Sequence, residues 1–137
     1  LSTFSYARLG LVASRTLWRI VDAEELNNWA NIHQAPEKLA VVFRIAGLIN
    51  RMVKGQEPDT ALWEDVKNAF LFLEQHEINQ EERGSQIFEL LTQLRILSRL
   101  GYVAEHDKWL NLPFAEAKKM KPLIISVINK ALQESQL

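Results

Sequence analysis

The stretch "EKLAVVFRIAGLINRMVK", residues 37–54, is the most apolar helical pattern in the chain. Its apolar side chains form two stripes at helical spacing: Leu39, Val42, Phe43, Ala46, Ile49 and Val53 in one, and Val41, Ile45, Leu48 and Met52 in the other. A helix that is apolar on two sides is typical of the centre of a bundle. Pro36 suits its first turn, and Gly55 is the residue type expected just beyond its end. The stretch therefore predicts a mainly α domain built around this helix.

Three later segments each carry an apolar face at helical spacing and add helices to the bundle. Their inward positions are Leu62, Val66, Ala69, Phe70 and Leu73 in the first, Ile87, Leu90, Leu91, Leu94 and Leu97 in the second, and Ile124, Ile125, Ile128 and Leu132 in the third. Asp59 or Thr60 predicts the start of the first helix, and Gly101 the end of the second. Pro122 predicts either a kink or a restart in the third. The polar segment 76–85 is the clearest predicted loop.

The N-terminal segments "FSYARLGLV" (4–12) and "TLWRIVDA" (16–23) are rich in strand-forming residues and are joined by a short turn. Two strands alone are marginally stable in water, so we expect this hairpin to be the edge of a sheet that belongs to a preceding domain. The chain begins with Leu1 rather than Met, as a fragment of a longer protein would. Asp22 is a good N-cap, with Glu25 three residues later, and this pattern predicts a helix from Asp22 to just before Pro36.

The predicted architecture is therefore a mainly α bundle of five to six helices behind a short N-terminal β-hairpin remnant. Residues 1–22 are assigned to the last strands of the preceding domain, and residues 23–137 to the helical domain. A length of 137 residues suits one domain with a sizeable core, and 47% apolar with 24% charged residues argues against wholesale disorder. No apolar run is long enough to cross a bilayer, so no membrane partner is expected.

The residue types that usually carry catalysis are sparse. Cysteine is absent, which removes thiol nucleophiles, disulfides and thiolate metal sites together. The histidines His33, His76 and His106 are far apart in sequence, and a lone polar histidine is usually a solvated side chain. The adjacent pairs Glu24–Glu25 and Glu81–Glu82 would point about 100° apart in a helix, so neither makes a natural acid–base pair. We therefore predict a protein that is not an enzyme, with no metal site and no cofactor.

Basic residues gather in clusters although the formal net charge is only -1. The candidate DNA contacts are Arg15 and Arg19 in the hairpin, Arg95 and Arg99 on the same helix side as Thr92, and Lys118, Lys119 and Lys121 beside Pro122. Trp18, Tyr102 and Trp109 are candidates for stacking on bases, although aromatic residues more often belong to the core. An ordinary solvated surface is the alternative interpretation of each cluster.

A second interpretation makes "LTQLRILSRLGYVAEHDKWLNL", residues 91–112, a DNA-reading unit. In winged helix–turn–helix proteins a recognition helix ends at a comparable step, and a β-hairpin wing follows. Against this, the preceding helices are long and apolar for a compact three-helix unit, and the pattern after Trp109 is helical. A winged-helix regulator remains an alternative, as does a helical protein–protein interaction module that does not contact DNA.

The order of three motifs resembles a known family. "TLWRIVDAEEL" (16–26) resembles the exit from an OB-fold, and "EPDTALWEDVKNAFLFLEQ" (57–75) and "FELLTQLRILSRLGY" (88–102) follow it. Together they resemble the DNA repair and recombination mediator family RecO, specifically its C-terminal helical domain with the last strands of its N-terminal OB-fold. The likeness covers nearly the whole chain, and each motif is a pattern of apolar positions rather than a catalytic signature.

The resemblance implies a non-enzymatic protein that binds and anneals single- and double-stranded DNA in the bacterial cytoplasm, associated with the nucleoid. It also implies two partners, the ring-forming protein RecR and the acidic tail of the single-strand-binding protein, through which the recombinase RecA is loaded. Many family members carry a four-cysteine zinc site after the Leu-Gly-Tyr step. This chain has "VAEHDKWLNLP" (103–113) there, so no zinc-dependent property is expected.

The apolar helix 37–54 also carries a strip that contains Arg44 and Arg51. Arginine binds carboxylates through strong, charge-assisted hydrogen bonds. We therefore expect a groove between helices, edged by Arg44 or Arg51, to capture an acidic, apolar peptide tail.

Overall fold

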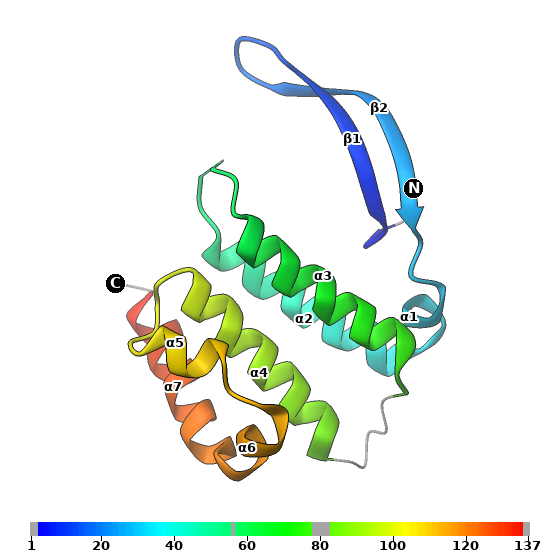
Figure 1. Ribbon diagram of the computed structural model, residues 1–137. Coiled ribbons are helices and arrows are strands. Elements are labelled where there is room, and N and C mark those ends of the chain that lie inside the picture. Colours follow the sequence, from blue (N-terminus) through cyan, green and yellow to red (C-terminus); the bar gives the residue numbers. More distant parts are fainter. Residues whose placement is uncertain (1–2, 56, 78–82, 136–137) are drawn as a thin grey trace.

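The structure, a computed structural model, describes residues 3–55, 57–77 and 83–135. Its elements are the strands β1 (Tyr6–Ala13) and β2 (Trp18–Asn27) and the helices α1 (Ala30–Gln34), α2 (Pro36–Met52), α3 (Thr60–Gln75), α4 (Arg83–Arg99), α5 (His106–Leu110), α6 (Phe114–Lys119) and α7 (Lys121–Glu134). Figure 1 shows the hairpin standing away from a body of packed helices. The predicted fold class, mainly α with a short N-terminal hairpin, is confirmed. The described residues contain seven helices rather than five to six, because α5 and α6 are short separate helices.

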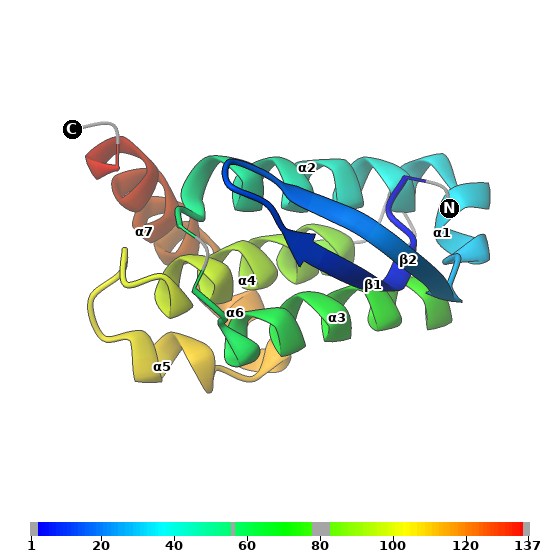
Figure 2. The same ribbon diagram turned by 90° about the horizontal axis from the view of Figure 1, so that it is seen from above.

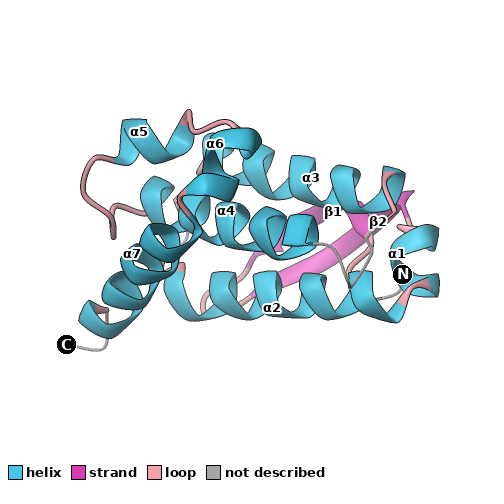
Figure 3. Cartoon of the chain, turned by 90° about the horizontal axis from the view of Figure 1, so that it is seen from below, coloured by secondary structure: helices cyan, strands magenta, loops and turns pink. Residues whose placement is uncertain are grey.

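Helix α4 is the centre of the bundle, and the prediction that the helix of residues 37–54 has this place is wrong. Five helices contact α4, and Figures 2 and 3 show it between α2 and α3. In α2, by contrast, Phe43 of the predicted apolar stripe is 57% exposed. The apolar pattern of the sequence did not indicate that α4 is central, because the buried residues Thr92 and Ser98 are polar and interrupt this pattern. Their hydroxyls donate to the carbonyl oxygens of Phe88 (2.8 Å) and Leu94 (2.7 Å), which removes most of the cost of burying them.

Two hydrophobic clusters meet on α4. The first, shared with α5, α6 and α7, contains Met52, Ile87, Leu91, Leu94, Leu97, Val103, Trp109, Leu112, Ala117, Ile124, Ile128 and Ala131. The second, shared with α1, α2 and α3, contains Trp29, Ile32, Val41, Val42, Ile45, Leu62, Leu73 and Ile96. Most predicted inward positions are therefore confirmed. Ile125 is an exception, because it is 36% exposed on α7.

The helix that was predicted to begin at Asp22 is a strand up to Asn27, so this part of the prediction is wrong. Residues 18–27 pair with β1 in an antiparallel ladder, in which Asp22 lies opposite Gly10. The ladder pairs backbone groups on one edge of β2 from Trp18 to Asn27, and this non-local pairing outweighs the local capping pattern. The adjacent carboxylates Glu24 and Glu25 thus lie in a strand, where successive side chains point to opposite faces.

The short helix α1 is capped by a residue that is distant in sequence. The carboxylate of Glu74 in α3 accepts hydrogen bonds from the backbone N–H groups of Asn31 (3.1 Å) and Ile32 (3.0 Å). Trp29, the residue before α1, is held in the left-handed region at φ 52° and is 3% exposed. The junction between hairpin and helices is therefore fixed by tertiary contacts rather than by local sequence.

The hairpin β1–β2 exposes apolar side chains along much of its length. They are Leu9, Leu11, Val12, Leu17, Trp18, Ile20, Val21 and Leu26. In the described residues the sheet consists of these two strands, and β2 extends past the boundary placed at residue 22. That the hairpin is the edge of a larger, OB-fold-like sheet stays a prediction.

Several predicted helix ends are confirmed. The Asp59 side chain caps α3 by accepting from the N–H of Leu62 at 2.9 Å. Pro122 lies in the first turn of α7, so the chain restarts a helix there rather than kinking one. The predicted loop 76–85 ends earlier than expected, because α4 begins at Arg83, and the pair Glu81–Glu82 lies outside the described residues.

Gly101 ends α4 as predicted, in a two-bond C-terminal motif. Its φ is +82°, its N–H donates to the carbonyl of Ser98 at 3.1 Å, and the N–H of Tyr102 donates to the carbonyl of Leu97 at 2.9 Å. This pair of bonds requires a residue in the left-handed region, where glycine avoids the strain that a Cβ causes.

We predict opposite effects on stability for two glycine-to-alanine changes. Gly101→Ala lowers the free energy of unfolding by about 1–2 kcal/mol, because alanine is strained at positive φ. Gly47→Ala, in the middle of α2, raises it by about 0.5–1 kcal/mol, because alanine loses less conformational entropy in a helix. A Cβ at either position meets no atom within 4 Å, so neither change is complicated by a clash. Urea denaturation measures both, and a stabilising Gly101→Ala would contradict the assigned backbone geometry.

Candidate functional site

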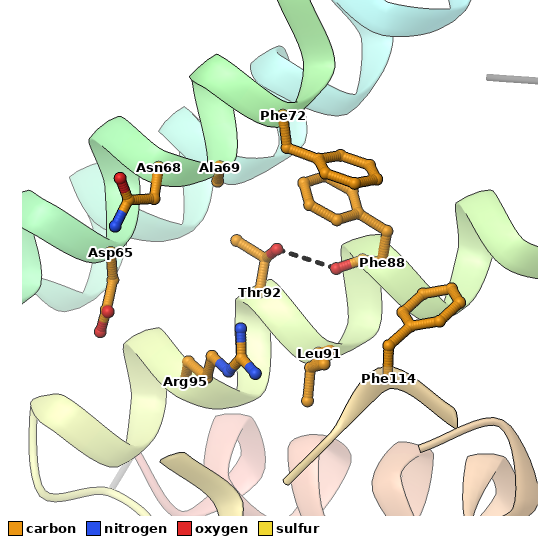
Figure 4. Close-up of a pocket in the computed structure, with 9 residues that line it drawn as sticks. All are labelled: Asp65, Asn68, Ala69, Phe72, Phe88, Leu91, Thr92, Arg95 and Phe114. Carbon is orange, nitrogen blue, oxygen red and sulfur yellow. Dashed lines mark hydrogen bonds between the residues drawn. The ribbon is translucent and has the colours of Figure 1, made fainter. Parts of the chain in front are cut away.

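A pocket of about 540 Å³ opens between α3, α4 and α6. Its lining residues, drawn in Figure 4, are Asp65, Asn68, Ala69, Phe72, Phe88, Leu91, Thr92, Arg95 and Phe114. Pockets of this size are typical of sites that hold a small ligand or an inserted side chain. Sequence patterns did not predict the pocket, because it is formed by three helices that are far apart along the chain.

Aromatic rings form much of the apolar wall of this pocket. Phe72 and Phe88 stack with 4.5 Å between their centroids and 18° between their planes. Phe72 also stacks with His76 at a centroid distance of 4.3 Å. Phe114 comes from α6, across the pocket from the other two phenylalanines, and is 39% exposed (Figure 4). Rings arranged in this way offer a planar apolar surface to an aliphatic or aromatic group.

Arg95 is the cation among the lining residues. Its Nη2 donates to the carbonyl oxygen of Leu112 at 3.1 Å, which holds the guanidinium against the connection between α5 and α6. Its Nε is buried and has no hydrogen-bond partner within the part of the chain that the structure describes. The Nε atom itself is out of reach of a ligand, but the guanidinium lies along the pocket (Figure 4). The pocket thus combines an apolar wall with a cation.

Asp65, the acidic lining residue, is already paired. Its Oδ2 accepts from Nε of Arg99 at 2.7 Å, and this hydrogen bond raises the pKa of Arg99. The carboxylate therefore does little to neutralise Arg95. Arg95 and Arg99, which were predicted as a pair of DNA contacts, lie one turn apart on α4, but they have different environments: Arg95 lines the pocket, and Arg99 is engaged at its edge.

One member of the predicted lysine cluster, Lys118, lies beside the same pocket. Nζ of Lys118 lies 5.1 Å from the ring centroid of Phe114, and Lys121 donates to Gln86 of α4 at 2.7 Å. Lys119 is exposed and stands 4.0 Å from Glu116. Lys118 is therefore next to the pocket, whereas Lys121 contacts Gln86, which is nine residues from Arg95 and lies on the other side of α4.

The other predicted basic residues lie elsewhere. Arg15 and Arg19 are exposed at and beside the turn of the hairpin, which Figure 1 shows on the opposite side of the molecule from α6. Arg44 binds both carboxylate oxygens of Glu89 in α4, and these bonds raise its pKa. Arg51 donates to the carbonyl of Leu132 at 3.5 Å. Arg44 and Arg51 thus join α2 to its neighbours, away from the pocket described above.

Of the aromatic residues that were candidates for base stacking, two belong mainly to the helical body. Trp109 is 3% exposed, so its proposed stacking role is wrong. Tyr102 is partly buried, and its hydroxyl lies 3.4 Å from the carbonyl of Met52. Trp18 is 57% exposed on the hairpin. The sequence analysis did not name Phe72 and Phe88 as candidate site residues. The available signal was that both apolar side chains lie outside the predicted inward faces of their helices, as exposed binding residues do.

Neither a metal site nor a membrane span is found in the described ranges. No group of three or more His, Asp and Glu side chains could hold a metal ion within residues 3–55, 57–77 and 83–135. No helix among these residues has the length and apolar character needed to cross a membrane. After α4 the chain forms α5 and α6, where a winged-helix protein would place a β-hairpin.

Comparison with protein-family models, with curated proteins and with solved structures finds no match for this chain. The function is therefore argued from the pocket, from the cations beside it and from the resemblance of the sequence motifs.

We predict that Arg95 contributes little to folding. Arg95→Met keeps the aliphatic packing and removes both the bond to Leu112 and the unsatisfied Nε, so the free energy of unfolding changes by less than about 1 kcal/mol. The charge-matched comparison is Arg99→Met, which leaves Asp65 unpaired and lowers stability by about 0.5–1 kcal/mol. Urea denaturation of both variants checks this, and a loss of several kcal/mol for Arg95→Met would make the residue structural.

Proposed function

We propose that this chain is a non-catalytic recombination mediator of the RecO type, which binds DNA and an acidic, apolar peptide tail of a partner protein. The observation that carries the proposal is the pocket between α3, α4 and α6, with its aromatic wall and its partly unpaired Arg95. The resemblance of the motifs supplies the biological setting, which is DNA repair at the bacterial nucleoid, with a RecR-like protein and a single-strand-binding protein as partners.

The chemistry of the pocket suits a tail that combines carboxylates with an apolar side chain. An apolar side chain packs against Phe72, Phe88 and Phe114 and removes their surface from water. A carboxylate next to it accepts from Arg95, and such charge-assisted bonds are stronger than bonds between neutral groups. Lys118 at the edge of the pocket adds attraction for further acidic residues. We place the site here rather than at the expected groove of Arg44 and Arg51, because Arg44 already binds a carboxylate, that of Glu89, whereas Arg95 bonds to a backbone carbonyl and lines a pocket.

The lysine cluster supports DNA binding that is tolerant of sequence. Lys118 and Lys119 are exposed on α6, and Lys121 follows at the first position of α7. Lysines contact phosphates, which are present at every nucleotide, and they release counterions when they do so. With a formal net charge of -1, the whole chain provides no general attraction for DNA, so a local cluster has to supply it.

A protein–protein interaction module without DNA binding is the second candidate function. The observation that favours it is the exposed apolar surface of the hairpin, because large exposed apolar patches mark interaction sites. A salt-dependent shift with a labelled single strand separates the two functions, since an interaction module gives no shift.

We predict that Arg95→Met weakens the binding of an acidic peptide that carries an apolar side chain by about tenfold or more, because a hydrogen bond to a charged group is lost. Asp65→Asn strengthens binding severalfold, because it releases Arg99 from its ion pair and makes the pocket more positive. Isothermal titration calorimetry with the synthetic peptide measures both changes.

The control for this experiment is Arg44→Met, which removes the same charge from α2 and leaves the pocket intact. Its peptide affinity should equal that of the wild type. If Arg44→Met weakens binding and Arg95→Met does not, the peptide site lies on the α2 strip that the sequence predicted.

We also predict that replacing Lys118, Lys119 and Lys121 together with Ala lowers DNA affinity and flattens its dependence on salt by up to about 3 phosphate contacts. The control is a triple Ala variant of Lys54, Lys108 and Lys130, which are exposed on other parts of the surface. Fluorescence anisotropy across a salt series measures the slopes, and equal slopes for the two variants would make the cluster ordinary surface.

A further inference from the structure

A second pocket, of about 200 Å³, lies between the start of β1 and the hairpin side of α3. Its lining residues are Phe4, Ser5, Tyr6, Trp29, Trp63, Val66, Lys67 and Phe70. Figures 1 and 2 show the start of β1 next to α3. Five of the eight lining residues are aromatic, which makes this pocket more aromatic than the one beside Arg95.

The rings form a connected cluster with a buried end and an open end. Tyr6 lies in the middle, 6.3 Å from Trp29 at an interplanar angle of 19°, and 5.6 Å from Trp63 at 48°. Trp29 packs on Phe70 at 5.8 Å and is 3% exposed. Trp63 is 46% exposed. The buried rings account for packing of the hairpin on the helices, whereas Trp63 is the most exposed of the five rings and lines the pocket.

The charged residues around the pocket determine which charge a bound planar ligand can carry. The lining contains no carboxylate, and it contains the cation Lys67, whose Nζ is 3.1 Å from Glu64 and whose side chain is 25% exposed. A cation beside the rings disfavours an ammonium ligand, which aromatic cages otherwise bind. Because the exposed pair of Lys67 and Glu64 contributes little, a phosphate can take the place of Glu64, and the site then favours a neutral planar ring that carries a negative charge beside it. The pocket has room for one ring but is small for a longer group.

A nucleotide within a single strand has this chemistry, because its base is a neutral planar ring and its phosphate is an anion. In a duplex the bases are paired and stacked on one another, so they cannot enter a side pocket without being flipped out. Stacking on an exposed indole is tolerant of sequence, because every base has a π-face.

We propose that the pocket of Tyr6 and Trp63 takes one unpaired nucleobase of a single strand, with the base stacked on Trp63 and a neighbouring phosphate at Lys67. The inference rests on the proposed DNA-binding function and assigns it a site that is separate from the lysine cluster. Trp63 and Phe72 are nine residues apart in α3, which places them on opposite sides of the helix at about 100° per residue. The base pocket and the peptide pocket are therefore on different faces of the same helix.

The test compares Trp63→Ala with Phe72→Ala, its matched control on α3, in anisotropy titrations with a labelled oligothymidylate. Trp63→Ala should weaken binding about five- to a hundredfold, as the loss of one stacked base does. Its salt dependence should match that of the wild type, because stacking releases no counterions. Its affinity for a duplex and for the acidic peptide should not change. Phe72→Ala should leave the oligothymidylate affinity unchanged and weaken the peptide.

A second variant tests the same contact without removing the ring. Trp63→Phe should bind the oligothymidylate nearly as well as the wild type and should lose most of the tryptophan fluorescence quenching that the oligonucleotide causes. Thermal melting of each variant confirms that it folds. If Trp63→Phe keeps the quenching, or Trp63→Ala keeps the affinity, the base site is wrong while the DNA-binding function stands.

Two other results also overturn the inference. If Trp63→Ala weakens duplex and single strand equally, or weakens only the peptide, the indole has another role. If the wild-type chain binds no single strand at all, both this inference and the proposed DNA-binding function fail.

Discussion

The packing of five helices against α4 is the constraint on which the rest of the structure depends. A helix can be surrounded by other helices only if its polar side chains find partners nearby, because an unpaired polar group in a core is costly. Thr92 and Ser98 bond back to the preceding turn, and Arg95 reaches the carbonyl of Leu112. Both hydrophobic clusters include side chains of α4. The helices α1, α2 and α3 and the helices α5, α6 and α7 therefore pack against the same helix.

The pocket beside Arg95 follows from the same packing. Both α3 and α6 contact α4, and the pocket lies between them, where Phe114 of α6 faces the rings of α3 and α4. Where the pocket opens between α3 and α6, a long side chain of α4 is only partly covered. Arg95 is the residue at this place, and it is half-buried. One turn later Arg99 meets Asp65 of α3 and is paired. The difference between the two arginines therefore comes from their neighbours and not from their own helix.

The sequence was sufficient for the four long helices α2, α3, α4 and α7 and for most of their ends, because helical periodicity and capping are local properties. It was insufficient wherever a distant segment decided the outcome. The strand to Asn27 depends on pairing with β1, and the central position of α4 depends on hydroxyls whose bonds the apolar pattern does not reveal. The candidate basic residues could be named from sequence, but their roles could not. Arg44 and Arg99 have carboxylate partners 45 and 34 residues away, and the pocket beside Arg95 requires three separate helices.

Helix α3 contributes residues to both candidate sites, the pocket beside Arg95 and the pocket of Tyr6 and Trp63. Leu62 and Leu73 fix it to the core, and Glu74 ties its end to α1. Because Trp63 and Phe72 project from opposite sides of this helix, a single strand and a peptide tail bound at the two sites are held a fixed distance apart. Ligands held in this way act on each other at a high effective concentration. The proposed function, which brings a partner protein to single-stranded DNA, makes use of this arrangement of the two proposed sites.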